Sequence, residues 1–182
     1  MPKGSARIAL LPSGPDFAND TAYDQLLQQV YRANARIYAV TPYFVPDEAF
    51  VHALSLAAQR GVDVCLVLPA TSNHRVADLC RRRPLRTLAS HGIRVLLLNR
   101  MCHAKVVLVD EDWVMAGSLN LDTRSFFLNY ELSCTFHDQP TLNKFSCWFD
   151  QLALTGTPYT PANPTWSQDL LEGAVRSFAY QL

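Results

Sequence analysis

The sequence predicts an α/β protein that folds as one domain over residues 1–182. Short runs of β-branched and aliphatic residues alternate with longer stretches of helical period, which is the pattern of α/β domains. Capping and turn residues separate these segments, and 49% of the residues are hydrophobic, which is enough to fill a substantial core.

The expected strands and helices follow this alternation along the chain. Asp47 offers an N-cap for one helix, and Gly61 offers its end. Gly92 closes another helix, which is broken or started afresh at Pro84. We expect strands over residues 7–11, 36–40, 63–68, 93–97, 103–109, 113–116 and 129–136. We expect helices over residues 19–33, 47–61, 75–91, 140–152 and 166–179.

The composition argues against several classes of protein. Lys plus Arg and Asp plus Glu each number 16, so the formal net charge is zero and no global field would attract nucleic acid. The five cysteines have no C-x-x-C spacing, so neither a disulfide framework nor a zinc ribbon is indicated, and a reducing compartment is the default. No apolar run approaches the roughly 20 residues of a membrane helix, and no signal peptide is recognised. We therefore expect the chain itself to be soluble.

Two residues on one expected strand are candidates for catalysis. His103 and Lys105 are two apart, and alternate residues of a strand point to the same face of the sheet. Asp110 has the opposite parity, so we expect it to stand apart from this pair. Without further support, a His and a Lys two apart on a strand are most often a solvated strand face.

A turn after the next strand supplies that further support. Gly117 gives the backbone freedom for a tight turn, which presents Ser118 and Asn120 as hydrogen-bond donors. The last expected strand separates a polar face from a core face by parity. The polar face holds Asn129, Glu131, Ser133 and Thr135, and the core face holds Tyr130, Leu132, Cys134 and Phe136.

This set of side chains suits phosphodiester transfer. The reaction needs a nucleophile or base that titrates near neutral pH, and donors for two nonbridging oxygens on which negative charge grows. The imidazole of His103 can attack phosphorus, Lys105 supplies positive charge, and neutral donors complete the set, so we expect no metal or cofactor. Glu131 is the best candidate for a carboxylate that fixes the imidazole tautomer, although a polar residue on an open sheet face is the alternative.

The motif resembles that of the phospholipase D superfamily, H-x-K-x4-D followed by G-S-x-N. The matching residues are His103, Lys105, Asp110, Gly117, Ser118 and Asn120. The segments LPSGP, TPYFVPD, DTRSFFLNYE and LLEGAVRSFAYQL extend the resemblance to the C-terminal half of bacterial cardiolipin synthases. The resemblance implies a mixed β-sheet flanked by helices on both faces, with an added C-terminal helix over residues 166–179.

The resemblance also implies roles for these residues. In the superfamily the histidine attacks, the lysine and asparagine hold phosphate, the motif aspartate is mainly structural, and a downstream carboxylate orients a histidine. The active site is built from two such motifs, whereas this chain has one. The second half is therefore expected from a partner, either the N-terminal half of a longer chain or a second copy in a homodimer.

Four residues are weaker candidates for substrate binding. Arg81 and Arg82 belong to a basic cluster that could bind anionic headgroups, although such clusters are more often a solvated helix face. Tyr43 and Phe44 follow a strand, where α/β domains often place ligand-facing loops, but an aromatic pair beside proline is as often packing. Histidines 52, 74, 91 and 137 show no ligand spacing and are assigned no function.

The resulting functional hypothesis is phosphatidyl transfer of the cardiolipin synthase type, in which phosphatidylglycerol yields cardiolipin and glycerol through a phosphohistidine. It implies a phospholipid substrate and a membrane surface, namely the cytoplasmic side of a bacterial membrane. The alternatives are a phospholipase D hydrolase and a homodimeric nuclease, whose usual basic charge is missing here. A catalytically incomplete lipid-binding domain is the non-enzymatic alternative.

Overall fold

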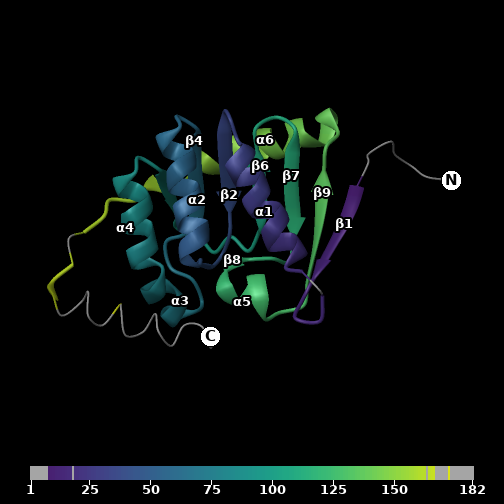
Figure 1. Ribbon diagram of the computed structural model, residues 1–182. Coiled ribbons are helices and arrows are strands. Elements are labelled where there is room, and N and C mark those ends of the chain that lie inside the picture. The colour runs from purple at the N-terminus through teal and green to yellow at the C-terminus, as the bar shows by residue number, and fades with distance from the viewer. Residues whose placement is uncertain (1–7, 18, 163, 167–171, 173–182) are drawn as a thin grey trace.

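The computed structural model describes residues 8–17, 19–162, 164–166 and 172. These residues form a mixed eight-stranded sheet in the order β1-β9-β7-β6-β2-β4-β5-β10, with β3 and β8 paired separately (Figure 1). The strands of the large sheet are β1 Ile8–Ser13, β2 Arg36–Val40, β4 Asp63–Pro69, β5 Arg94–Leu98, β6 Val106–Val109, β7 Trp113–Gly117, β9 Glu131–Phe136 and β10 Thr157–Pro158. The small pair is β3 Phe44–Val45 and β8 Leu121–Asp122.

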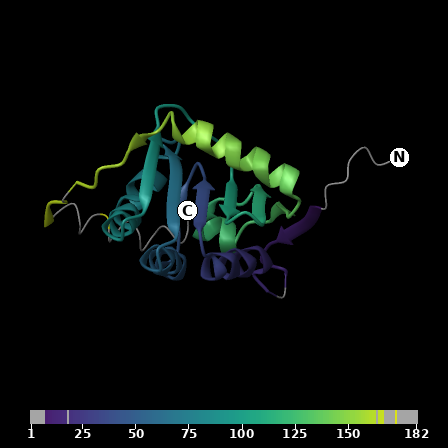
Figure 2. The same ribbon diagram turned by 90° about the horizontal axis from the view of Figure 1, so that it is seen from above.

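Helices cover both faces of the sheet, as expected. The view from above shows α1 and α2 along one face and α6 across the other (Figure 2). The helices are α1 Thr21–Arg32, α2 Glu48–Gln59, α3 Arg75–Cys80, α4 Arg82–Ser90, α5 Thr123–Phe127 and α6 Gln139–Ala153. The main core lies beneath α1 and α2, where Leu26 and Phe50 are at most 1% exposed. Under α6, Phe149 stacks on Tyr38 with ring centroids 4.4 Å apart.

Local capping explains where several helices begin. The carboxylate of Asp47 accepts hydrogen bonds from the backbone N–H groups of Ala49 and Phe50, so the predicted N-cap of α2 is confirmed. Gly61 follows the end of that helix with a φ of 91°, a conformation that glycine adopts without strain. The helical stretch expected over residues 75–91 is divided into two helices close to the expected break, and Pro84 lies in the first turn of α4, where a missing N–H costs least.

The register of the strands gathers one set of strand ends at a single edge of the sheet. Val40 at the end of β2 pairs with Val67 of parallel β4 and with Val106 at the start of antiparallel β6. Val106 pairs in turn with Ala116 near the end of β7. The carboxyl ends of β2, β4 and β7 therefore meet the amino ends of β6 and β9, and the connecting segments at this edge carry the candidate residues.

Two expectations about the strands differ from the structure. Strand β6 begins at Val106, so His103 and Lys105 precede it rather than lie in it. Strand β9 begins at Glu131, because the preceding residues form α5 and a turn that the sequence pattern did not predict. The pair β3 and β8 and the short strand β10 were also not expected. The helix expected over residues 166–179 lies outside the described residues, apart from Trp166 and Glu172.

The face of β9 that was expected to be polar and exposed is buried, whereas the expected core face is exposed at the start of the strand and packs against α6 at Phe136. Ser133 and Thr135 are each 1% exposed, whereas Tyr130 and Leu132 are 65% and 52% exposed. Thr135 pairs with Met115, which belongs to the main core, so tertiary packing buries the polar side of this strand. The expectation of a polar outer face and an apolar inner face was therefore wrong for β9.

Candidate active site

The residues of the expected motif, apart from Asp110, surround the start of β6. His103 is exposed and Lys105 half-buried, and the ammonium of Lys105 donates to the His103 carbonyl oxygen at 3.0 Å. The N–H of Gly117 donates to the Lys105 carbonyl oxygen at 3.2 Å, which extends the β6–β7 pairing by one residue. Partial burial lowers the pKa of Lys105, and the nearby carboxylates of Glu131 and Asp122 partly oppose that shift. Both carboxyl groups thus favour the charged form of Lys105.

Gly117 permits a close crossing of the turn and strand β9. A Cβ atom at this position would lie 2.5 Å from the Cα of Ser133, so any other residue would force backbone apart. The following turn is held to β9, because the N–H of Leu132 donates to the Ser118 hydroxyl oxygen at 2.9 Å. Close packing therefore explains the glycine, and not backbone freedom alone.

A chain of hydrogen bonds fixes Glu131. The Ser118 hydroxyl donates to one of its carboxylate oxygens, and the side-chain amide of Asn129 donates to the other at 3.3 Å. Arg124 in turn donates from Nε to the Asn129 amide oxygen at 3.1 Å. Both oxygens of Glu131 are thus engaged by Ser118 and Asn129, and among the described residues Glu131 does not bond to the His103 imidazole as the sequence had suggested.

Asn120 has one amide atom bonded and one available. Its Nδ2 donates to the Ser125 hydroxyl oxygen at 3.2 Å, while Oδ1 is buried with no hydrogen-bond partner among the described residues. The two amide atoms can exchange places by a flip, so either a donor or an acceptor could face the site. A buried polar atom of this kind costs free energy unless a ligand or water pairs with it.

Asp110 lies at the opposite end of β6 and is part of the scaffold. Its carboxylate accepts hydrogen bonds from the backbone N–H groups of Asn34, Ala35 and Arg36 at 2.8–3.0 Å. Partial burial raises the pKa of Asp110, but these three donors outweigh that effect, so the net shift is downward. Asp110 therefore stands apart from His103, as expected, but because the two residues flank opposite ends of β6 and not because of strand parity, since neither belongs to the strand.

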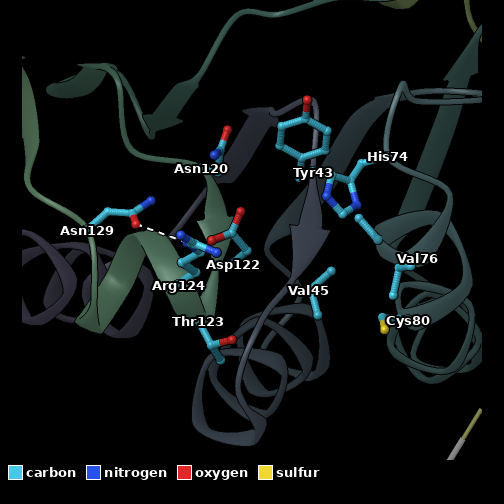
Figure 3. A pocket seen from close by; sticks show the side chains of 11 residues that line it. Tyr43, Val45, His74, Val76, Cys80, Asn120, Asp122, Thr123, Arg124 and Asn129 are labelled. Carbon is cyan, nitrogen blue, oxygen red and sulfur yellow. Dashed lines mark hydrogen bonds between the residues drawn. The ribbon is translucent and has the colours of Figure 1, made fainter. Parts of the chain in front are cut away.

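A cavity of about 260 Å³ lies beside these residues (Figure 3). Tyr43 and His74 form one side of it, with ring centroids 6.2 Å apart, and Tyr43 makes an equally distant edge contact with His103. The other lining residues are Val45, Val76, Ala77, Cys80, Asn120, Asp122, Thr123, Arg124 and Asn129. The cavity therefore shares Asn120 with the motif and reaches His103 through Tyr43.

The four weaker candidates lie in different environments. Tyr43 lines the cavity, whereas Phe44 is fully buried in the main core. Arg81 is 6% exposed and donates to the carbonyl oxygens of Pro69 and Ala70 at 2.8 and 2.7 Å. Phe44 and Arg81 cannot contact a substrate in this conformation, so the structure does not support that expectation for them.

Arg82 belongs to a second group of charged residues. Its side chain is 56% exposed and lies 4.0 Å from the carboxylate of Glu172, which also pairs with Arg86 at 2.6 Å. The cluster that was expected to attract anionic headgroups therefore already holds a carboxylate from the C-terminal part of the chain.

Sequence reasoning missed His74 and Asp122. The pairing of β3 with β8 brings Tyr43 beside Asn120 and Asp122, and the β4–α3 connection adds His74. Burial raises the pKa of Asp122 and the charge of Glu131 adds to this, while hydrogen bonds from Ser125 act in the opposite direction. The only sequence signal for either residue was its position after a strand.

Within the described part of the chain, no helix is both long and apolar enough to cross a membrane. The same residues contain no group of three or more His, Cys, Asp or Glu side chains placed to hold a metal ion.

Comparisons with known proteins agree with the fold. Two relatives are the cardiolipin synthases A of Cronobacter sakazakii and Escherichia coli O157:H7, 36% identical over 132 and 133 residues. Each match covers 72% of this chain, which spans only 27% of the length of these relatives.

Solved structures give the same fold at lower identity. The phospholipase D family member Nuc from Salmonella typhimurium superposes with a TM-score of 0.71 at 21% identity, covering 85% of this chain and 99% of Nuc. The phosphatidylserine synthase of Haemophilus influenzae gives a TM-score of 0.74 at 16% identity, covering 96% of this chain and 46% of that protein.

The decisive match is to a family model. The model described as the cardiolipin synthase, PLD-like domain matches residues 26–153, which include every residue of the motif around His103. The chain therefore belongs to the cardiolipin synthase, phospholipase D-like domain family.

Proposed function

We propose that this chain is one catalytic half of a phosphatidyltransferase of the cardiolipin synthase type. The main support is the gathering of His103, Lys105 and Asn120 at one edge of the sheet, beside a cavity with an unpartnered amide atom. The relatives named cardiolipin synthase A support the lipid substrate rather than another phosphodiester.

In the proposed first step, an imidazole nitrogen of His103 attacks the phosphorus of phosphatidylglycerol. A phosphorus–nitrogen bond forms as the bond from phosphorus to the oxygen of the headgroup glycerol breaks. The departing headgroup glycerol takes a proton from a second histidine. Lys105 and Asn120 hold the nonbridging oxygens, on which negative charge grows.

In the second step, the hydroxyl group of another phosphatidylglycerol attacks the phosphohistidine and loses its proton to the same second histidine. The phosphorus–nitrogen bond breaks, the product is cardiolipin, and His103 is restored. Water as the attacking group would give phosphatidic acid, which is the hydrolase alternative.

The second histidine has to come from outside this segment. One imidazole cannot be bonded to phosphorus and act as the proton-transfer group at the same time. Histidines 52, 74, 91 and 137 are not followed two residues later by lysine. We propose that a second His-x-Lys half completes the site, at the cytoplasmic surface of a bacterial membrane.

Glu131 is proposed to support the residues that hold the phosphate, without contacting the phosphate itself. Its bonds to Ser118 and Asn129 hold the turn that carries Asn120. A negative charge near Lys105 also favours the charged ammonium that phosphate binding needs.

The test compares the intact protein with its His103→Ala variant on phosphatidylglycerol vesicles and, separately, on plasmid DNA. Release of glycerol together with a four-chain lipid, lost in the variant, supports transfer. Cleavage of DNA that depends on His103, without a lipid product, would favour the nuclease alternative. Phosphatidic acid as the sole lipid product would favour the hydrolase.

A further inference from the structure

We infer that the cavity beside His103 is a subsite for a small neutral polyol, and that His74 determines its preference for polyols over simple alcohols. This inference rests on the proposed transfer at His103, and it concerns the free glycerol that leaves phosphorus in the first step and that attacks phosphorus in the reverse of that step. The imidazole of His74 faces the cavity (Figure 3), and His74 does not belong to the motif around His103.

The position of the cavity fits the alcohol side of the reaction. Asn120 lines the cavity and also belongs to the motif around His103. Tyr43 contacts two imidazoles, with its ring centroid 6.2 Å from that of His74 and 6.2 Å from that of His103. An alcohol held here would contact Asn120 of the motif and Tyr43, whose ring contacts His103, and transfer requires the alcohol to be held on this side of the site.

The size of the cavity fits a headgroup rather than acyl chains. Its volume of about 260 Å³ is slightly below the range of roughly 300–1,000 Å³ that is typical of sites for drug-sized ligands. A three-carbon polyol would fill part of this volume, whereas a diacylglycerol would not fit. Val45, Val76 and Cys80 give one side an apolar surface against which a carbon chain can pack (Figure 3).

The charges of the lining residues favour a neutral ligand. Asp122 supplies one carboxyl group and Arg124 one guanidinium, whose Nε already bonds to Asn129. A second phosphate would meet the carboxyl group of Asp122 at close range. Hydroxyl groups, by contrast, can donate to a carboxylate and exchange hydrogen bonds with amide and imidazole nitrogens.

The backbone of His74 is held firmly while its ring remains available. Its N–H donates to the Ser72 hydroxyl oxygen at 3.0 Å, and that hydroxyl donates to the His74 carbonyl oxygen at 3.1 Å. The neighbouring Asn73 accepts a hydrogen bond from the Tyr43 hydroxyl at 2.5 Å, which ties the turn to the ring. No described residue hydrogen-bonds to the His74 ring nitrogens, so a substrate hydroxyl can pair with them.

The experiment offers the intact protein two competing alcohols that share a three-carbon chain. Vesicles of phosphatidylglycerol are incubated with equal concentrations of isotopically labelled glycerol and 1-propanol, and labelled phosphatidylglycerol and phosphatidylpropanol are quantified. The product ratio reports the preference for a polyol, because both alcohols intercept the same intermediate.

Loss of one hydrogen bond to the glycerol should lower this ratio about three- to tenfold in His74→Ala. His74→Gln, which retains a donor and an acceptor, should recover part of the preference. His52→Ala is the matched control, because His52 is an exposed histidine on α2 outside the cavity, and its ratio should equal that of the wild type.

An unchanged ratio in His74→Ala, with both products still formed, would overturn the polyol subsite and leave the proposed transfer intact. If the wild type formed neither product, the proposed function would be overturned and the subsite with it. The same would follow if the His103→Ala variant still formed both products.

Discussion

Replacement of Asp110 by Asn tests the division between scaffold and chemistry most directly. Asn tolerates the left-handed backbone that Asp110 adopts, with a φ of 51°, so the substitution adds little strain. The remaining carbonyl oxygen can still accept from Ala35 and Arg36, which share Oδ1 at 2.8 and 2.9 Å. The new amide group, however, places a donor against the N–H of Asn34, which now bonds to Oδ2 at 3.0 Å.

The expected cost is the loss of one hydrogen bond to a charged group, about 1.5–3 kcal/mol of unfolding free energy. For a chain of this length each kcal/mol lowers Tm by about 2–4 °C, so Tm should fall by about 3–12 °C. Asp112→Asn is the matched control, because its ion pair with Arg32 joins side chains that are 59% and 57% exposed. That change should cost at most about 1 kcal/mol.

The loss of stability in Asp110→Asn should become smaller as the pH is lowered. Because the pKa of Asp110 is lower in the folded state, its stabilising contribution is present above its unfolded pKa of about 4 and is lost as the pH falls through the folded value. The difference in Tm between wild type and Asp110→Asn should therefore shrink below about pH 4. An unchanged Tm at pH 7, combined with a loss of turnover as large as that of His103→Ala, would refute the structural role of Asp110.

Four further predictions address the site and its surroundings. His103→Ala should abolish the covalent phosphohistidine and lower turnover by many decades with little change in Tm, since His103 is exposed; retention of a trapped phosphoenzyme would contradict this. EDTA should leave turnover unchanged, because Lys105 and Asn120 supply the charge and donors, and a loss restored by a divalent ion would argue the opposite. A strictly monomeric 182-residue chain should be inactive, which light scattering together with a lipid assay can check, and full turnover by such a monomer would rule out the second half. Arg81→Ala should lower the unfolding free energy, measured by chemical denaturation, by roughly 3 kcal/mol, because the Arg81 side chain is only 8% exposed. Arg82→Ala should lower it by less than about 0.5 kcal/mol, because the Arg82 side chain is 56% exposed, and equal effects of the two variants would contradict this prediction.

Much of the fold follows from local patterns in the sequence. The strands around β2, β4, β5 and β7 lie within about one residue of the expected ranges, because a short apolar run bounded by turn residues has few other stable conformations. The Asp47 N-cap and the Gly61 stop are equally local, since each depends on a few neighbouring backbone groups. The separation of Asp110 from His103 and Lys105 was also expected, although the strand parity from which it was argued does not apply, because β6 includes only Val106–Val109.

The errors lie where a local pattern is overridden by packing. Alternation along β9 predicted a polar outer face, yet Ser133 and Thr135 are buried because the sheet turns that side toward the core under α1. Arg81 was one of several arginines in a basic run, and only the tertiary structure shows that it caps the carbonyl oxygens after β4. The sequence pattern cannot distinguish these outcomes, because burial depends on which element packs against which face.

The sequence by itself determined the class of fold, the approximate positions of the seven longest described strands and the motif of residues suited to phosphoryl chemistry. Those features depend on hydrophobic period, turn residues and spacing, which are properties of contiguous segments. Only the tertiary structure decided that β3 pairs with β8 and that Tyr43 contacts both His74 and His103. Such contacts join residues far apart in the chain, and their stability comes from the register of the sheet and the burial of its faces rather than from any local preference.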